Sequence, residues 1–330
     1  MSQDRHGDDL AFPDRGRDAN GHLGHPHDDH THLGERDQLA GAGWSVWTTG
    51  QRQARQQRGS RYSRLSVEHP AKMLPAIAQH AIRAYTRPGE VVLDPMCGIG
   101  TTLVEAVHLG RDAVGIELEP KWASIARLNL ETAAVHGAPG QGTVHTGEGA
   151  EVAASLGSSL AGRVRLVLTS PPYGSMTHGQ VRSRRDGAQA VEKYAHVYAR
   201  ERDEKVANLA YQKPEALLGS FSRILAACRP LLAPGGVVVV TTRPYRKDGH
   251  LIDFPGQVAE ASRRAGLVQV DRCVALLCAL RDGELVSRGS FFQIIETRRL
   301  RKAGIPVHVI QHEDALVFTN PASEQEAQAA

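Results

Sequence analysis

Two hydrophobic patterns alternate along the middle of this chain: short unbroken apolar runs, and longer stretches with apolar residues at helical spacing. The short runs are typical of strands that are buried on both faces of a sheet. They predict strands at residues 90–93, 112–116, 143–145, 164–168, 237–240, 267–280 and 315–318. The helical spacing predicts helices at residues 74–85, 101–109, 215–232 and 254–265. This alternation predicts an α/β fold with a doubly wound sheet.

The composition outside these elements sets the domain boundaries. The chain has 330 residues, 41% of them hydrophobic, so we expect one large domain, residues 67–320, with tails. Residues 1–43 are rich in His, Asp and Gly and are predicted to be disordered, as is the polar tail 321–330. Residues 44–66 form an arginine-rich segment, and the stretches 174–213 and 281–311 are expected to be insertions in the domain.

Several function classes are excluded by what the sequence lacks. Nothing organises the histidines of the first tail around an ion, so no metal site is predicted. We find no apolar segment that could span a membrane and no secretory signal. The four cysteines, which lack zinc spacing, fit a reducing cytoplasm.

A glycine turn follows the first strand of the domain, in the sequence Asp94-Pro95-Met96-Cys97-Gly98-Ile99-Gly100. Gly98 and Gly100 let a ligand approach the main chain, and Thr101 and Thr102 begin the next helix. Leu103 stands where a dinucleotide fingerprint needs glycine, and no lysine follows Gly100 as in a Walker loop. Asp94 would repel a pyrophosphate and suits a ligand that bears an ammonium or sulfonium group.

Two further acids follow predicted strands. Glu117 ends the second strand, where a carboxylate can accept hydrogen bonds from ribose hydroxyls. Glu148 follows the third strand. The alternative for each acid is a solvated residue at a helix cap.

Ser170-Pro171-Pro172-Tyr173 follows the fourth strand. The prolines have fixed φ and no N–H, and Pro171 restricts Ser170 to extended conformations, so the segment presents carbonyls on a stiff frame.

With the glycine turn before it, this segment resembles the S-adenosylmethionine-dependent methyltransferases that modify the exocyclic amino groups of nucleobases, the N4-cytosine and N6-adenine DNA methyltransferase family. The resemblance covers about residues 69–318. It implies S-adenosylmethionine as cofactor, a Rossmann-like sheet of order 3-2-1-4-5-7-6 with an antiparallel last strand, and a methyltransferase activity. It also implies that Glu148 contacts the adenine, and that His69 and Pro70 pack over the methionine moiety. The glycine-turn residues Asp94, Pro95, Cys97, Gly98, Gly100, Thr101 and Thr102 would belong to the cofactor site, with Glu117.

The catalytic residues are predicted to be Ser170, Pro171, Pro172 and Tyr173. An exocyclic amine is a poor nucleophile, and we expect the Ser170 hydroxyl and the Pro171 carbonyl to accept its two hydrogens and free the nitrogen lone pair. Tyr173 would stack on the flipped base. A serine in the first position is typical of cytosine-N4 enzymes, which leaves adenine-N6 and RNA amino-methylation as alternatives. Cytosine-C5 chemistry needs a thiolate, and the segment has no cysteine.

Nucleic acid is the predicted partner, with DNA favoured over RNA. The net charge is only +3, but Arg55, Arg58, Arg61 and Arg64 recur at every third residue near Trp44, Trp47 and Tyr62, which could stack on bases. Arg182, Arg184 and Arg185 form a second basic cluster in the first insertion. A third lies in 281–310, with Arg298, Arg299, Arg301 and Lys302. The non-enzymatic alternative is a nucleic-acid-binding protein on an inactive methyltransferase scaffold.

Overall fold

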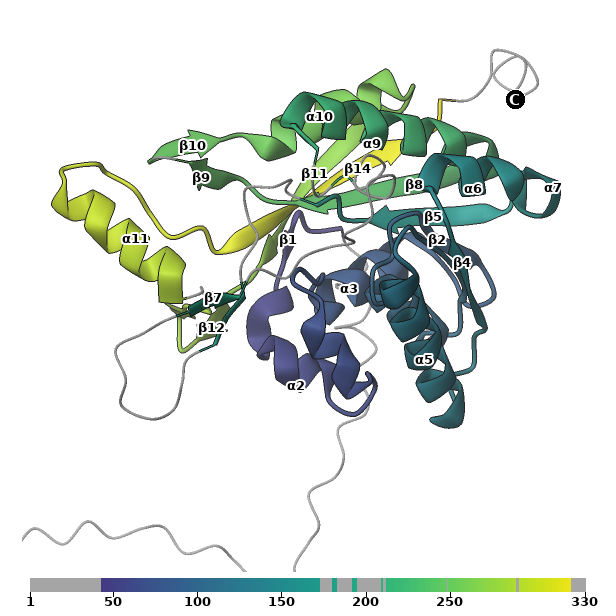
Figure 1. Ribbon diagram of the computed structural model, residues 1–330, viewed down its shortest axis with the longest axis horizontal. Coiled ribbons are helices and arrows are strands. Elements are labelled where there is room, and N and C mark those ends of the chain that lie inside the picture. Colours follow the sequence, from purple (N-terminus) through teal and green to yellow (C-terminus); the bar gives the residue numbers. More distant parts are fainter. Residues whose placement is uncertain are drawn as a thin grey trace, which may run out of the picture. The chain divides into compact units, whose positions relative to one another are not determined.

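The computed structural model describes residues 43–172, 180–182, 192–194, 209, 212–247, 249–288 and 291–321, with the backbone alone at 180–182, 192–194 and 291–292 (Figure 1). Tyr173, Arg184 and Arg185 lie outside the described residues, as does most of the insertion 174–213. Contacts divide the chain into Met1–Gly43 and Trp44–Ala330, and the elements below belong to the second unit.

An eight-stranded sheet forms the centre of this unit, in the order β1-β11-β14-β8-β5-β2-β3-β4 (Figure 1). Its strands are β1 Val46–Trp47, β2 Val91–Asp94, β3 Asp112–Glu117, β4 Gly142–Thr146, β5 Val164–Thr169, β8 Leu232–Thr242, β11 Val268–Leu276 and β14 His312–Thr319. The last strand, β14, runs antiparallel to both β8 and β11. Read from β4 to β11, the order is the predicted 3-2-1-4-5-7-6, so the predicted doubly wound fold is confirmed.

The eighth strand, β1, was not predicted. It pairs parallel to β11 through Val46 and Trp47, opposite Val274 and Ala275. The Trp47 ring is 2% exposed and stacks on His80 at 4.4 Å between centroids. Trp47 is therefore a core residue, and its interpretation as a base-stacking ring was wrong.

Helices cover both faces of the sheet (Figure 1). Buried residues of α3 Pro75–Tyr85, α4 Thr101–His108 and α5 Pro120–Val135 share one apolar core with the sheet. Those of α6 Gly149–Ser155, α7 Gly157–Leu160, α9 Pro214–Cys228 and α10 Phe254–Arg264 share the other. The other helices among the described residues are α2 Ala54–Arg58, α11 Phe291–Lys302 and the 3-10 turns η1 Thr49–Gln51, η2 Arg64–Glu68 and η5 Arg229–Leu231.

Short two-stranded ribbons complete the described elements. They are β6 Gln180–Arg182 with β7 Glu192–Tyr194, β9 Tyr245–Lys247 with β10 His250–Ile252, and β12 Ala279–Arg281 with β13 Glu284–Val286. The strand predicted over 267–280 is thus two strands, since β11 ends at Leu276 and β12 begins at Ala279.

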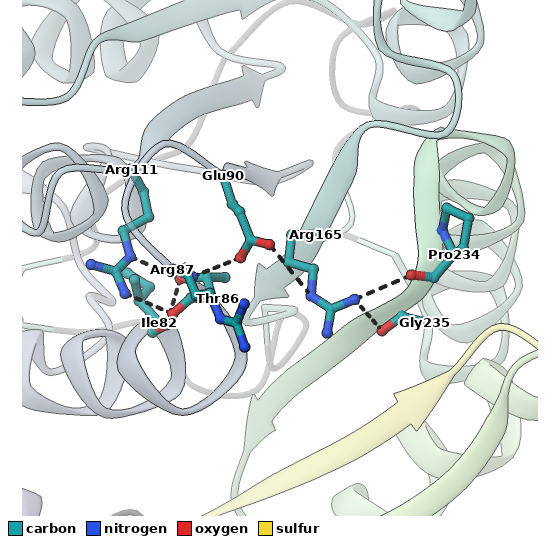
Figure 2. A network of polar contacts seen from close by, with 8 residues as sticks. All are labelled: Ile82, Thr86, Arg87, Glu90, Arg111, Arg165, Pro234 and Gly235. Carbon is teal, nitrogen blue, oxygen red and sulfur yellow. Dashed lines mark hydrogen bonds and ion pairs between the residues drawn. The ribbon is translucent and has the colours of Figure 1, made fainter.

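The helix predicted to reach residue 232 ends earlier, at Cys228. Strand β8 already begins at Leu232, ahead of the predicted start at residue 237. Pro234, Gly235 and Gly236 therefore lie within its irregular first half, where the register with β5 shifts. Arg165 of β5 bridges this irregularity, because its Nη1 donates to the carbonyls of Pro234 and Gly235 at 3.2 and 2.8 Å (Figure 2).

The same polar network fixes the amino end of the sheet, opposite the glycine turn (Figure 2). Arg111 donates through Nε to the Thr86 hydroxyl at 2.9 Å and through Nη2 to the Thr86 carbonyl at 2.7 Å. Glu90 accepts from the Arg87 N–H at 2.6 Å and lies 4.0 Å from Arg165 Nε. These contacts join the end of α3 to the starts of β2, β3 and β5.

Candidate cofactor and catalytic site

The glycine turn and the serine segment leave the same end of the sheet from neighbouring strands. Strand β2 pairs parallel with β3 on one side and with β5 on the other. The glycine turn follows β2 and Ser170 follows β5. In doubly wound sheets ligands bind outside the carboxyl ends of the strands, where the strand order reverses, and β2 and β5 flank that point.

Asp94, the last residue of β2, connects the two segments. Its Oδ1 accepts from the Thr169 hydroxyl at 2.8 Å, and its Oδ2 accepts from the Thr102 hydroxyl at 2.7 Å. Burial raises the pKa of Asp94 to about 6, and the hydrogen bonds from Thr102 and Thr169 oppose that rise. Thr169, one residue before Ser170, is a site residue that the sequence analysis missed.

The glycine turn has the backbone conformation that its residues require. Gly98 and Gly100 have φ of 54° and 78°, a region that favours glycine. A Cβ at Gly98 would lie 3.1 Å from Nε2 of His69, so the imidazole rests directly on the turn. His69 also packs edge-on against Trp122 at 4.7 Å between centroids. Because Gly98 has no side chain, the His69 ring can lie directly against the backbone of the turn.

Glu117 holds the turn from the end of β3. Its Oε2 accepts from the Gly98 N–H at 2.8 Å, and its Oε1 accepts from the Glu119 N–H at 2.9 Å. Burial raises the pKa of Glu117 to about 7. Each carboxylate oxygen has two lone pairs, so each can accept one more hydrogen bond from a ligand hydroxyl.

Glu148 caps α6. Its Oε2 accepts from the N–H groups of Ala150 and Glu151, both at 2.9 Å. Glu148 therefore makes the helix-cap contact that the sequence analysis named as the alternative. Its other carboxylate oxygen, Oε1, takes no part in the cap. A contact with adenine stays a prediction.

The other predicted cofactor residues lie around the same turn. Pro95, Cys97, Thr101 and Gly100 are buried, and Pro70 is half-buried. Burial raises the pKa of the Cys97 thiol well above its usual range. A neutral thiol is a weak nucleophile, which agrees with a site that does no thiolate chemistry.

The serine segment is described as far as Pro172. Ser170 and Pro172 are half-buried and Pro171 is buried. Thr169 pairs with Val240, so Ser170 leaves the sheet beside the carboxyl end of β8. The catalytic roles of Ser170, Pro171, Pro172 and Tyr173 stay predictions.

Part of the arginine-rich segment lies against the domain. Arg61 Nη1 forms an ion pair with the buried Glu105 at 2.6 Å, and Arg58 Nη2 donates to the Met73 carbonyl at 2.7 Å. Tyr62 is buried and donates to Glu105 at 2.5 Å. This corrects the interpretation of Tyr62 as a base-stacking ring, and Arg58 and Arg61 make contacts within the protein. Arg55 and Arg64 are exposed, and Arg182 is described by its backbone in β6.

Residues 23–128 match the sequence profile of a protein family described as DNA methylase. This part of the chain is therefore similar to the DNA methylase family. The match includes the glycine turn, Glu117 and His69, and ends before the serine segment.

Curated relatives match over short stretches. The Type II methyltransferase M.BglI of Bacillus subtilis is 34% identical over 101 residues, 30% of this chain and 27% of the relative. M2.DpnII of Streptococcus pneumoniae is 41% identical over 64 residues, 19% of this chain and 24% of the relative. A tRNA (guanine(10)-N2)-dimethyltransferase of Methanocaldococcus jannaschii is 39% identical over 64 residues, 19% of this chain and 18% of the relative. The chain thus spans about a quarter or less of the length of these three relatives. Among solved structures, TrmN from Thermus thermophilus aligns over 79% of this chain and 53% of its own, with 18% identity and a TM-score of 0.42.

The similarity to the DNA methylase family implies S-adenosylmethionine as the cofactor, and the residues of the site fit it. His69 lies over the turn at Gly98, and Glu117 at the end of β3 offers carboxylate oxygens to ribose hydroxyls. Asp94 and Glu117 are buried carboxylates with raised pKa values. A nearby cation would stabilise their charged forms, and S-adenosylmethionine carries both a sulfonium and an ammonium group.

In the described part of the chain, no three His, Cys, Asp or Glu side chains gather as metal ligands would. None of its helices has both the length and the apolar character of a transmembrane span.

Proposed function

We propose that the protein is an S-adenosylmethionine-dependent methyltransferase that methylates the exocyclic amino group of a nucleobase, N4 of cytosine in DNA. The observation that carries this proposal is the Thr169–Asp94 hydrogen bond of 2.8 Å, which joins the serine segment to the glycine turn. The two segments are thereby held on one rigid sheet edge, as a transfer between two bound reactants requires.

In the proposed mechanism, the cofactor supplies a methyl group on a positively charged sulfur. The Ser170 hydroxyl and the Pro171 carbonyl accept the two amino hydrogens of the base, which frees the nitrogen lone pair. Held by Glu117 and the glycine turn, S-adenosylmethionine would supply the methyl group to this nitrogen and leave its sulfur as a neutral thioether, and the proton lost by the amine would pass to solvent. Glu117 orients the ribose hydroxyls, and His69 covers the turn. No covalent bond to the protein is needed.

Two features favour cytosine in DNA. Serine stands in the first position of the serine segment, and two of the relatives above are Type II methyltransferases. The alternatives are N6 of adenine and an RNA base, the latter supported by the tRNA methyltransferase relative. Expression in a host without N4-methylcytosine, followed by mass spectrometry of nucleosides from its DNA and RNA, tests the proposal. We expect N4-methyldeoxycytidine with the wild type and far less of it with Ser170→Ala.

We further propose that α11 contributes to the nucleic-acid surface. Arg298 and Lys302 of this helix are exposed, and the chain runs from it into the start of β14. Asp314 of β14 pairs with Thr242, at the carboxyl end of β8. The helix therefore precedes a strand that begins at the same sheet edge as Ser170.

Replacing Arg298 and Lys302 by alanine should weaken DNA binding. It should also reduce the slope of the logarithm of the binding constant against the logarithm of the salt concentration by up to about two, roughly one for each lost phosphate contact. Fluorescence anisotropy with duplex DNA at several salt concentrations measures both. The matched control is the double variant Arg163→Ala/Arg264→Ala, whose exposed residues lie before the amino ends of β5 and β11. If the two double variants weakened DNA binding equally, the loss would follow from net charge alone, and the proposed contact between α11 and nucleic acid would be contradicted.

Cofactor affinity should rise with pH. Burial raises the pKa of Glu117 to about 7, and a cationic ligand binds its ionised form more tightly. We therefore expect the dissociation constant for S-adenosylmethionine to increase about tenfold from pH 8 to pH 6, the change that a group of this pKa produces when only its ionised form binds. Isothermal titration calorimetry measures it. Glu117→Gln should bind weakly and show a much flatter profile over the same range. A steep profile that persists in this variant would show that another group titrates.

A further inference from the structure

A short segment before the domain lies across helices α4 and α5. We call residues 61–69 the strap. Near its start, Arg61 and Tyr62 donate to the two carboxylate oxygens of Glu105, a fully buried residue of α4. At its other end, His69 rests on Gly98 of the glycine turn. The strap is thus fixed to the domain on both sides of residues 63–66.

Asn129 of α5 contacts both the strap and the glycine turn, and its side chain is completely buried. Its Oδ1 accepts from the Ser63 N–H at 2.8 Å, and its Nδ2 donates to the Ile99 carbonyl at 2.8 Å. Nδ2 also lies 2.9 Å from the Ser66 hydroxyl oxygen. The orientation of the amide follows from its partners, because a backbone N–H can only donate and a carbonyl can only accept.

Ile99 is the residue between the two glycines of the turn. Its side chain is 2% exposed, in a small core cluster with Tyr62, Val104, Trp122 and Ile125. Gly98 and Gly100 on either side have positive φ and little conformational preference of their own. External contacts must therefore hold the turn in one conformation.

Three hydrogen bonds fix two peptide groups of the turn, Cys97–Gly98 and Ile99–Gly100. The Gly98 N–H donates to Glu117 at 2.8 Å, the Gly100 N–H donates to the Cys97 carbonyl at 2.7 Å, and the Ile99 carbonyl accepts from Asn129. Of the side chains that make these bonds, Glu117 belongs to the cofactor site already described. Asn129 belongs to α5, and the same side chain also binds the strap through the Ser63 N–H.

We propose that Asn129 is a positioning residue of the cofactor site, which uses the strap to hold the Ile99 peptide and thereby presets the glycine turn for S-adenosylmethionine. The inference rests on the proposed function, because it assigns this ligand to the turn. A preset turn costs less conformational entropy on binding. Asn129 is then required for cofactor affinity although it does not contact the cofactor.

The test compares two near-isosteric variants by calorimetric titration with S-adenosylmethionine. Asn129→Asp keeps the acceptor for Ser63 and places a carboxylate oxygen against the Ile99 carbonyl. We expect its dissociation constant to rise about tenfold, the size of one lost buried hydrogen bond. Tyr62→Phe is the control, because it removes a buried strap hydrogen bond, to Glu105, and leaves the Asn129–Ile99 bond in place. Its dissociation constant should stay within about twofold of wild type at a temperature where all proteins are folded.

The outcomes separate a positioning role from a structural one. Equal dissociation constants for the two variants would overturn the proposal, even if both lower the melting temperature. Should Asn129→Asp fail to fold, Ser66→Ala decides in its place, since it loosens the Asn129 amide and keeps the bond to Ile99. We then expect about a threefold rise, and an unchanged constant would contradict the inference. Wild-type protein that binds no S-adenosylmethionine would instead refute the proposed function.

Discussion

Replacing Ser170 by alanine should lower the rate of methyl transfer by about 10² to 10³, the effect of removing one group that stabilises developing charge in an active site. The serine hydroxyl is proposed to accept one amino hydrogen of the base, and alanine cannot. The cofactor dissociation constant should not change, because Ser170 follows β5 and the glycine turn follows β2. Single-turnover kinetics with labelled S-adenosylmethionine, together with calorimetry, measure the two quantities separately.

Thr169→Val is the informative companion to this variant. It removes the 2.8 Å hydrogen bond to Asp94 and keeps the shape of the side chain. Since Asp94 belongs to the glycine turn, this variant should affect both cofactor binding and transfer, whereas Ser170→Ala should affect transfer alone. Undiminished transfer in Ser170→Ala with the cofactor bound would refute the catalytic assignment.

Replacing Glu105 by alanine should lower the free energy of unfolding by about 3–5 kcal/mol, the usual cost of removing one partner of a buried ion pair. Its carboxylate accepts from Arg61 at 2.6 Å, Gln79 at 2.6 Å and Tyr62 at 2.5 Å. The substitution leaves the buried Tyr62 hydroxyl and the largely buried Arg61 guanidinium without their acceptor. Urea unfolding followed by circular dichroism measures the change.

The matched control is Glu296→Ala in α11. Glu296 forms an exposed ion pair with Arg299 at 2.6 Å, and exposed pairs contribute little to the free energy of unfolding. Similar losses for the two variants would mean that the Glu105 cluster is solvated in solution and that the strap is not held as the structure indicates.

Much of the fold could be predicted from the sequence, because buried parallel strands are continuous apolar runs. The strand predicted at 112–116 is β3 Asp112–Glu117, and the helix predicted at 254–265 is α10 Phe254–Arg264. The seven-strand order followed from the family resemblance and not from periodicity. Strand β1 escaped prediction because two residues are too few to show a period.

The glycine turn and Glu117 could also be located from the sequence, since both follow strands directly. Thr169, Glu105 and Asn129 could not. Each makes its contact with residues at least 25 positions away, Thr169 with Asp94, Glu105 with Gln79 and Asn129 with Ile99. Arginines at every third position suggested a nucleic-acid face, yet Arg61 proved to be the partner of a buried acid. A charge pattern cannot reveal a carboxylate that another helix brings beneath it.

The most direct test of the central claim is transfer of a tritiated methyl group from S-adenosylmethionine to three acceptors: duplex DNA, single-stranded DNA and total RNA from an unmethylated host. The labelled product is then digested and its nucleosides are separated. We predict that the label is found in N4-methyldeoxycytidine. Label in a ribonucleoside would contradict the DNA assignment, and label in N6-methyldeoxyadenosine would contradict the choice of base. The absence of both transfer and cofactor binding would contradict the whole account.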